Sequence, residues 1–89
     1  MMRKIIRLGD PTSHGGKVVS VAAAHFIVAG IPVARVGDLC TCPLKGHNGC
    51  TIVEGDPHHT IDGIPVAYEG HKTSCGAALQ ATVGNFGHN

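Results

Sequence analysis

Side chains that bind metal ions are frequent in this sequence. Its 89 residues include four cysteines and seven histidines. Structural zinc sites surround the ion with four thiolate or imidazole ligands in a tetrahedron. Because the first residues do not read as an export signal, these cysteines favour metal ligation over disulfide bonds. The sequence therefore predicts a zinc centre, and the fold must bring four such side chains together.

Three of these side chains occupy the same position of an internal repeat. The sequence Gly-Ile-Pro-Val-Ala at residues 30–34 returns at residues 63–67, and Arg-Leu-Gly-Asp at residues 7–10 is similar to Arg-Val-Gly-Asp at residues 35–38. In each copy, a metal-binding side chain follows the shared glycine by five positions. These side chains are His14, Cys42 and Cys75.

The repeat also predicts how these side chains meet. A unit this short cannot bury its own apolar face, so we expect three copies to pack about an approximate threefold axis. Residues 43–47 include a glycine and can place His47 over the axis, and its spacing from Cys42 is close to ordinary zinc-ligand spacing. The predicted zinc ligands are His14, Cys42, His47 and Cys75.

The other cysteines and histidines have plainer explanations. Cys40 and Cys50 fall outside the repeat registration, so they are left out of the site; they either stay free thiols or pair as a disulfide after export. Replacing Cys75 is therefore expected to weaken zinc binding more than replacing Cys50. His59 or His71 is an alternative fourth ligand. His71 stands where the other copies have an aspartate, a residue that commonly accepts a backbone hydrogen bond in a tight turn.

Short β-strands must position these residues, because glycine and proline interrupt the apolar segments at close intervals. Proline places residues 31–34 and 64–67 at a strand start or a sheet edge. Residues 18–28 compete as a helix through their alanine run, but the Val, Ile and Phe around it favour a sheet. The other predicted strands are residues 18–21, 25–28, 50–54, 60–62 and 78–83.

Composition fits a single domain spanning residues 1–89. Hydrophobic residues make up 43% of the chain but aromatic residues only 3%, so thin layers of Val, Ile and Ala must form the core. A chain this short needs a staple, and zinc is the candidate. The expected fold is mainly β, a compact conical pseudo-threefold repeat domain of short strands stapled by zinc. A formal charge of +1 without a basic stripe argues against nucleic acid as a partner.

Export and membrane signals are weak. Gly-Asp-Pro at residues 9–11 interrupts the N-terminal segment before an apolar run of signal-peptide length develops. The apolar residues 18–36 contain His25, Gly30 and Pro32, so they do not read as a transmembrane helix. We expect a soluble protein that is made in the cytoplasm.

Two of the repeat copies carry a distinctive tetrapeptide, Pro-Val-Ala-Arg at residues 32–35 and Pro-Val-Ala-Tyr at residues 65–68. Both are similar to the Pro-Ala-Ala-Arg element of the PAAR-repeat family, the spike tips of type VI secretion systems. The opening Gly-Asp-Pro-Thr-Ser-His-Gly-Gly at residues 9–16 also resembles the first turn of that family. The similarity extends to about Phe86, and Tyr68 and His71 depart from the family pattern.

The resemblance implies a stand-alone conical tip that caps and sharpens a trimeric VgrG β-helix spike. Such a tip helps to puncture target membranes or to deliver effector proteins, and it leaves the cytoplasm on the spike. The expected partners are a trimeric VgrG-like protein that carries one tip monomer, effector cargo and, transiently, the target membrane. Family members bind one zinc ion through three histidines and one cysteine, so the predicted ligand set of two histidines and two cysteines departs at one ligand.

The alternative function is a small zinc-dependent hydrolase or redox protein. A catalytic zinc needs an open coordination position and a nearby general base. The sequence has no His-Glu-x-x-His, no Ser-His-Asp pattern and no Cys-x-x-Cys, since Cys40 and Cys42 are separated by one residue. We therefore expect no enzymatic activity.

Overall fold

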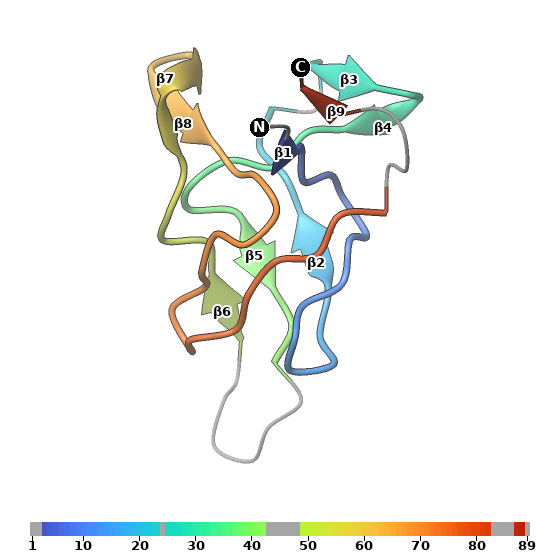
Figure 1. Cartoon of the computed structure of the whole chain (residues 1–89), viewed down its shortest axis with the longest axis vertical. Coiled ribbons are helices and arrows are strands. Elements are labelled where there is room, and N and C mark those ends of the chain that lie inside the picture. Colours follow the sequence, from blue (N-terminus) through green and yellow to red (C-terminus); the bar gives the residue numbers. More distant parts are fainter. Residues whose placement is uncertain (1–2, 24, 43–48, 83–86, 89) are drawn as a thin grey trace.

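The structure is a computed structural model that describes residues 3–23, 25–42, 49–82 and 87–88. All regular secondary structure in these ranges is β-strand, arranged in four antiparallel sheets (Figure 1). Three sheets have two strands each and pair β1 with β9, β3 with β4, and β7 with β8; the fourth has the order β2-β5-β6. The strands are β1 (Arg3–Lys4), β2 (Val18–Ser20), β3 (Ile27–Val28), β4 (Ile31–Pro32), β5 (Leu39–Cys40), β6 (Cys50–Thr51), β7 (Asp56–Ile61), β8 (Ile64–Val66) and β9 (Gly87–His88).

The three repeats meet in a closed ring of main-chain hydrogen bonds. The N–H of Ile6 donates to the carbonyl of Ala67 over 3.0 Å, the N–H of Ala67 to Ala34 over 3.0 Å, and the N–H of Ala34 to Ile6 over 2.9 Å. These residues are equivalent in the repeat, and each is 0% exposed. Because the ring closes on itself, the copies are related by a pseudo-threefold axis, as the repeat predicts.

The same cyclic pattern recurs along the axis. The glycine that each copy shares donates its N–H to the carbonyl of a buried apolar residue. That apolar residue donates its own N–H back to the carbonyl of the residue after the glycine. The glycine bonds are Gly9 to Val18, Gly37 to Ile52 and Gly70 to Leu79, over 2.9, 2.8 and 2.9 Å. All three apolar residues are about 1% exposed and form a second buried layer next to the first ring.

Most strand assignments from the sequence are correct in kind but too long, whereas the predicted strand 60–62 covers only the end of the longer β7. The described part of residues 18–28 contains β2 and β3 and no helix. Residues 50–54 shorten to β6, and residues 78–83 contribute isolated bridges at Ala78 and Leu79. The sequence reading missed β1, β5 and β9. Most strands are only two or three residues long, so much of the contact between repeat copies consists of isolated β-bridges and turns.

The two-stranded sheets gather at one end of the molecule, with both chain termini, whereas the β2-β5-β6 sheet lies toward the opposite end (Figure 1). The β3-β4 and β7-β8 hairpins turn through Ala29-Gly30 and Asp62-Gly63, where all four residues have positive φ. Two consecutive residues of this kind make the tight turn that suits the twist of an antiparallel hairpin. We call the end that carries the three two-stranded sheets the broad end.

The arginines of the first two repeats tie the body to this broad end. Arg7 is 6% exposed, and its guanidinium donates to the carbonyl of Val28 over 3.1 Å. Arg35 is 7% exposed and donates in the same way to Ile61 over 2.9 Å. In the third repeat Tyr68 replaces the arginine, and its hydroxyl is hydrogen-bonded to Nδ1 of His59 on β7. The repeat position thus keeps its role as a tether although its side chain changes.

The turns that follow these residues confirm the expected role of the aspartates. The N–H of Arg7 donates to Asp10 over 2.8 Å, and that of Arg35 donates to Asp38 over 2.7 Å. In the third copy the N–H of Tyr68 donates to Nδ1 of His71 over 2.9 Å. The histidine does the work of the aspartate, since both offer an acceptor at this distance from the backbone.

This equivalence predicts the behaviour of two variants. In His71→Asp the carboxylate restores the acceptor of the other repeats, so the thermal midpoint should stay close to that of the parent. His71→Ala should lose about 1 kcal/mol of stability, or about 4–8 °C in the midpoint, because a main-chain donor loses its partner. Thermal unfolding followed by circular dichroism distinguishes them. Equal destabilisation of both variants would contradict the equivalence.

Candidate metal centre

Two turns of the same design hold the first and third candidate ligands. The N–H of Thr12 donates to the carbonyl of Gly16 over 2.8 Å, and that of Thr73 donates to Ala77 over 2.9 Å. Between these bonded ends lie His14 and Cys75, each followed by a glycine with φ of 82° or 84°. Residues with a side chain rarely adopt this conformation, so the glycine sets the direction in which the preceding side chain leaves the turn.

The turns are also bonded to one another. The N–H of Ser13 donates to the carbonyl of Ala78 over 2.8 Å, while the N–H of Ala78 donates back to the Ser13 hydroxyl over 2.8 Å. The same reciprocal pair joins Thr41 to Lys17, over 2.8 and 3.0 Å, and joins Ser74 to Thr51, over 2.8 and 3.1 Å. One residue of each pair directly precedes a candidate ligand in the sequence; these residues are Ser13, Thr41 and Ser74. The relative positions of the three ligands are therefore set by contacts between repeats.

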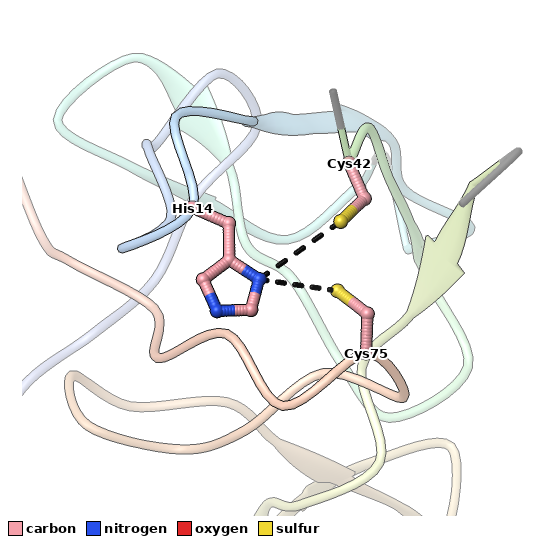
Figure 2. Close-up of side chains that lie close together, drawn as sticks. All are labelled: His14, Cys42 and Cys75. Carbon is pink, nitrogen blue, oxygen red and sulfur yellow. Dashed lines mark hydrogen bonds between the residues drawn. The ribbon is translucent and has the colours of Figure 1, made fainter. Parts of the chain in front are cut away.

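The three side chains at the repeat position converge (Figure 2). Nδ1 of His14 lies 3.9 Å from Sγ of Cys42 and 3.8 Å from Sγ of Cys75. Ligand atoms of all three residues lie within 4.8 Å of one another. Cys42 is buried, and His14 and Cys75 are half-buried, so the cluster is partly shielded from water.

These distances fit a tetrahedral metal. A zinc ion with bonds of about 2.3 Å to sulfur and about 2.1 Å to nitrogen holds a sulfur and a nitrogen ligand about 3.6 Å apart. The observed separations exceed this value by only a few tenths of an ångström, so small side-chain movements suffice. The mixture of thiol and imidazole donors suits zinc and similar ions better than Mg²⁺ or Ca²⁺, which prefer oxygen. The cluster can hold a metal ion.

The sequence offered three histidines as the fourth ligand: His47, with His59 and His71 as alternatives. His47 lies outside the described residues. His59 and His71 do not join the cluster; Nδ1 of each is hydrogen-bonded to Tyr68, toward the broad end. Neither alternative ligand named from the sequence is therefore placed at the centre.

Cys50, which the sequence reading left out of the site, is 4% exposed and belongs to the same buried core cluster as Cys42. It is not among the residues whose ligand atoms converge. Cys50 occupies a second position that is equivalent in the three repeat copies. Val18, Ile52 and Leu79 are equivalent, so the residues two positions earlier, Gly16, Cys50 and Ala77, are equivalent as well.

The local environment separates the protonation states of these thiols. Burial raises the pKa of Cys50, and hydrogen bonds to Cys75 and Cys42 raise it further. Burial also acts to raise the pKa of Cys75, but hydrogen bonds from Cys50, Thr73 and Cys42 overcome it and lower the pKa below its ordinary value. Cys75 thus carries negative charge more readily than Cys50, and the charged thiolate is the form that binds metal.

Cys40 belongs to the core instead. It pairs with Cys50 across the β5-β6 ladder, at the repeat position that Thr12 and Thr73 occupy in the other copies. Burial raises the pKa of its thiol to about 11, and the nearby Cys75 and Asp38 add to the rise, so the thiol stays neutral at physiological pH. No disulfide joins any of the four cysteines in this structure, so the disulfide considered from the sequence does not form.

Comparison with known proteins agrees with this geometry. The PAAR motif family matches residues 8–81, a range that contains all three residues of the cluster and both tetrapeptides. No curated protein matches the sequence. Because the family match covers most of the chain, and because the described residues form the pseudo-threefold repeat with converging metal-binding side chains, this chain belongs to the PAAR motif family, the spike-tip family of type VI secretion.

Proposed function

We propose that the chain is a spike tip that caps and sharpens a trimeric VgrG β-helix spike and holds one zinc ion at its narrow end. The narrow end is the end opposite the broad end, where His14, Cys42 and Cys75 converge. The observation that carries the proposal is the closed ring of Ile6, Ala34 and Ala67, which gives one chain three nearly equivalent faces. A trimer presents three equal edges at its end. A single pseudo-threefold chain can therefore meet each subunit in a similar way.

The broad end is the surface that we assign to the spike. The end of a β-helix exposes strand edges, and a cap covers them through main-chain hydrogen bonds and apolar contacts. The broad end supplies three short antiparallel sheets. It also exposes Phe26 and Ile27, at 39% and 55%, on the β3-β4 hairpin. The candidate metal centre lies at the opposite end, where the proposed tip meets the target membrane first.

Export follows from the same role. We infer that the chain is made in the cytoplasm and leaves the cell on the spike, with effector proteins as cargo. None of the described residues form a helix of the length and apolar character that crossing a membrane requires. Enzymatic activity is not part of the proposal, because a closed shell of four ligands leaves zinc no position for a reacting water.

The stoichiometry tests the capping role directly. The purified chain should be a monomer, and mass measurement of its complex with a trimeric VgrG spike should give one tip for each trimer. Three tips for each trimer would show that the repeat does not match the partner's symmetry.

A matched pair of surface variants tests which face binds. Ile27 and Val53 are 55% and 51% exposed, but Ile27 lies on β3 at the broad end, whereas the N–H of Val53 donates to Lys72 on the side of the body. Ile27→Asp should weaken binding to the spike about tenfold or more, since a charge would be buried among apolar contacts. Val53→Asp should bind like the parent. If both variants changed binding to the spike equally, the broad end would not be the docking surface.

Removal of the metal tests the staple. Structural zinc contributes about 10 kcal/mol in small domains, so chelation should lower the thermal midpoint by more than about 15 °C. Acid should release the metal as well, because protons compete for the thiolates. Cys75→Ser should already melt at the lower temperature and respond little to the chelator. An unchanged midpoint after complete zinc removal would rule out the staple.

A further inference from the structure

The third repeat departs from the other two at a pair of positions that contact each other. Tyr68 stands where the other copies have arginine, and His71 stands where they have aspartate. The phenol and imidazole rings meet edge to face, with their centroids 6.4 Å apart. Because both replacements fall in one copy and their rings are in contact, they form one unit, which we call the Tyr68–His71 turn.

The hydrogen bond in this turn fixes which nitrogen of His71 carries a proton. Nδ1 lies 2.9 Å from the main-chain nitrogen of Tyr68, whose N–H can only donate. Nδ1 is therefore an unprotonated acceptor, and the neutral ring carries its proton on Nε2. A protonated imidazolium has an N–H group at both nitrogens, so it offers no acceptor and cannot make this bond.

The equivalent turns of the other two copies do not share this sensitivity. Asp10 and Asp38 accept the corresponding backbone N–H over 2.8 and 2.7 Å. A carboxyl group keeps an acceptor oxygen even after it is protonated. Histidine, in contrast, ordinarily takes up a proton close to neutral pH, at about pH 6.5. Mild acid therefore acts on one of the three turns and spares the other two.

The bond that acid removes lies at a buried junction. Tyr68 is 2% exposed, so its N–H loses its partner at a place with little access to water. The same residue forms a β-bridge with Ile5, directly after β1, and its hydroxyl is hydrogen-bonded to Nδ1 of His59 on β7. Ile5 and Tyr68 also share one buried core cluster. Loosening of the turn is thus passed on to two of the sheets at the broad end.

The titratable groups around His71 come from its own turn and from the segments packed against it. Two of them are carboxylates that accept main-chain N–H groups: Glu69 accepts from Ala81 over 3.1 Å, and Glu54 accepts from Lys72 over 2.8 Å. Each carboxylate is thus already bonded to a backbone donor other than Tyr68. The full set is Tyr68, Glu69 and Lys72 in the turn, Lys4 on β1, His59 on β7, and Glu54.

We propose that the Tyr68–His71 turn is an acid-sensitive switch, which opens when His71 takes up a proton and loosens the broad end on one of its three sides. The proton comes from solvent and binds Nδ1, and no other covalent bond changes. Because the folded chain binds the neutral ring, the stabilisation is present above about pH 6.5 and is lost as the pH falls below that value. The switch uses only contacts within the chain, so it is independent of the proposed function.

Nuclear magnetic resonance of the ¹⁵N-labelled parent protein tests the switch without any variant. The ring nitrogens of His71 should show the Nε2–H tautomer at about pH 7.5. When the pH is lowered to about 5.5, the amide of Tyr68 should lose about fivefold or more of its protection against hydrogen exchange, relative to the amides of Arg7 and Arg35. An Nδ1–H tautomer of His71, or equal changes at the three amides, would overturn the proposal.

Matched variants separate the switch from the release of metal by acid. His71→Asn keeps an acceptor oxygen that cannot be protonated in this range, and it leaves the residues of the candidate metal centre unchanged. Between about pH 7.5 and 5.5, the thermal midpoint of the parent should fall by about 4–8 °C more than that of His71→Asn. His58→Asn removes an exposed histidine on β7 and should show the full fall of the parent. If the parent and His71→Asn lost the same number of degrees, His71 would not be the switch.

Discussion

Three copies of one short segment approach each other closely enough to share main-chain hydrogen bonds on an axis, and the rest of the structure depends on this contact. Strands of two or three residues cannot form a stable sheet by themselves. Here each strand is extended by bonds to the next copy, and the last copy bonds to the first. Ala34 and Ala67 are fully buried at the ring because two other backbones lie alongside. A larger side chain at either position would separate the copies.

Because the backbones are equivalent, the side chains are free to differ, and the differences mark the specialised positions. Asp10, Asp38 and His71 accept the same backbone hydrogen bond with two different chemical groups. Gly16, Cys50 and Ala77 share one place, but only the cysteine carries a side chain that can donate or accept a hydrogen bond. Sequence divergence at equivalent positions is therefore compatible with one architecture, provided that the hydrogen-bonding or packing role is kept or a new role is gained.

The two ends of the axis use this symmetry differently. At the narrow end, three turns point unlike donor atoms at a common centre, which suits one metal ion. At the broad end, three two-stranded sheets gather, and the buried Arg7 and Arg35 fasten two of them to the body. In the proposed tip, force applied at the end that holds the candidate metal centre would pass through the hydrogen-bonded rings to the broad end.

The sequence by itself determined the repeat, the mainly β character and the three metal-binding types of side chain that share one repeat position. These followed from identities at fixed offsets and from glycine and proline, which act locally on the backbone. Strand lengths and the place of Cys50 came only from the tertiary structure. The second copy contains additional residues between Cys42 and Cys50, so its second half shifts out of the register of the first. Only hydrogen bonds between copies reveal that Cys50 stands level with Gly16 and Ala77, because that register is set by partners distant in the chain.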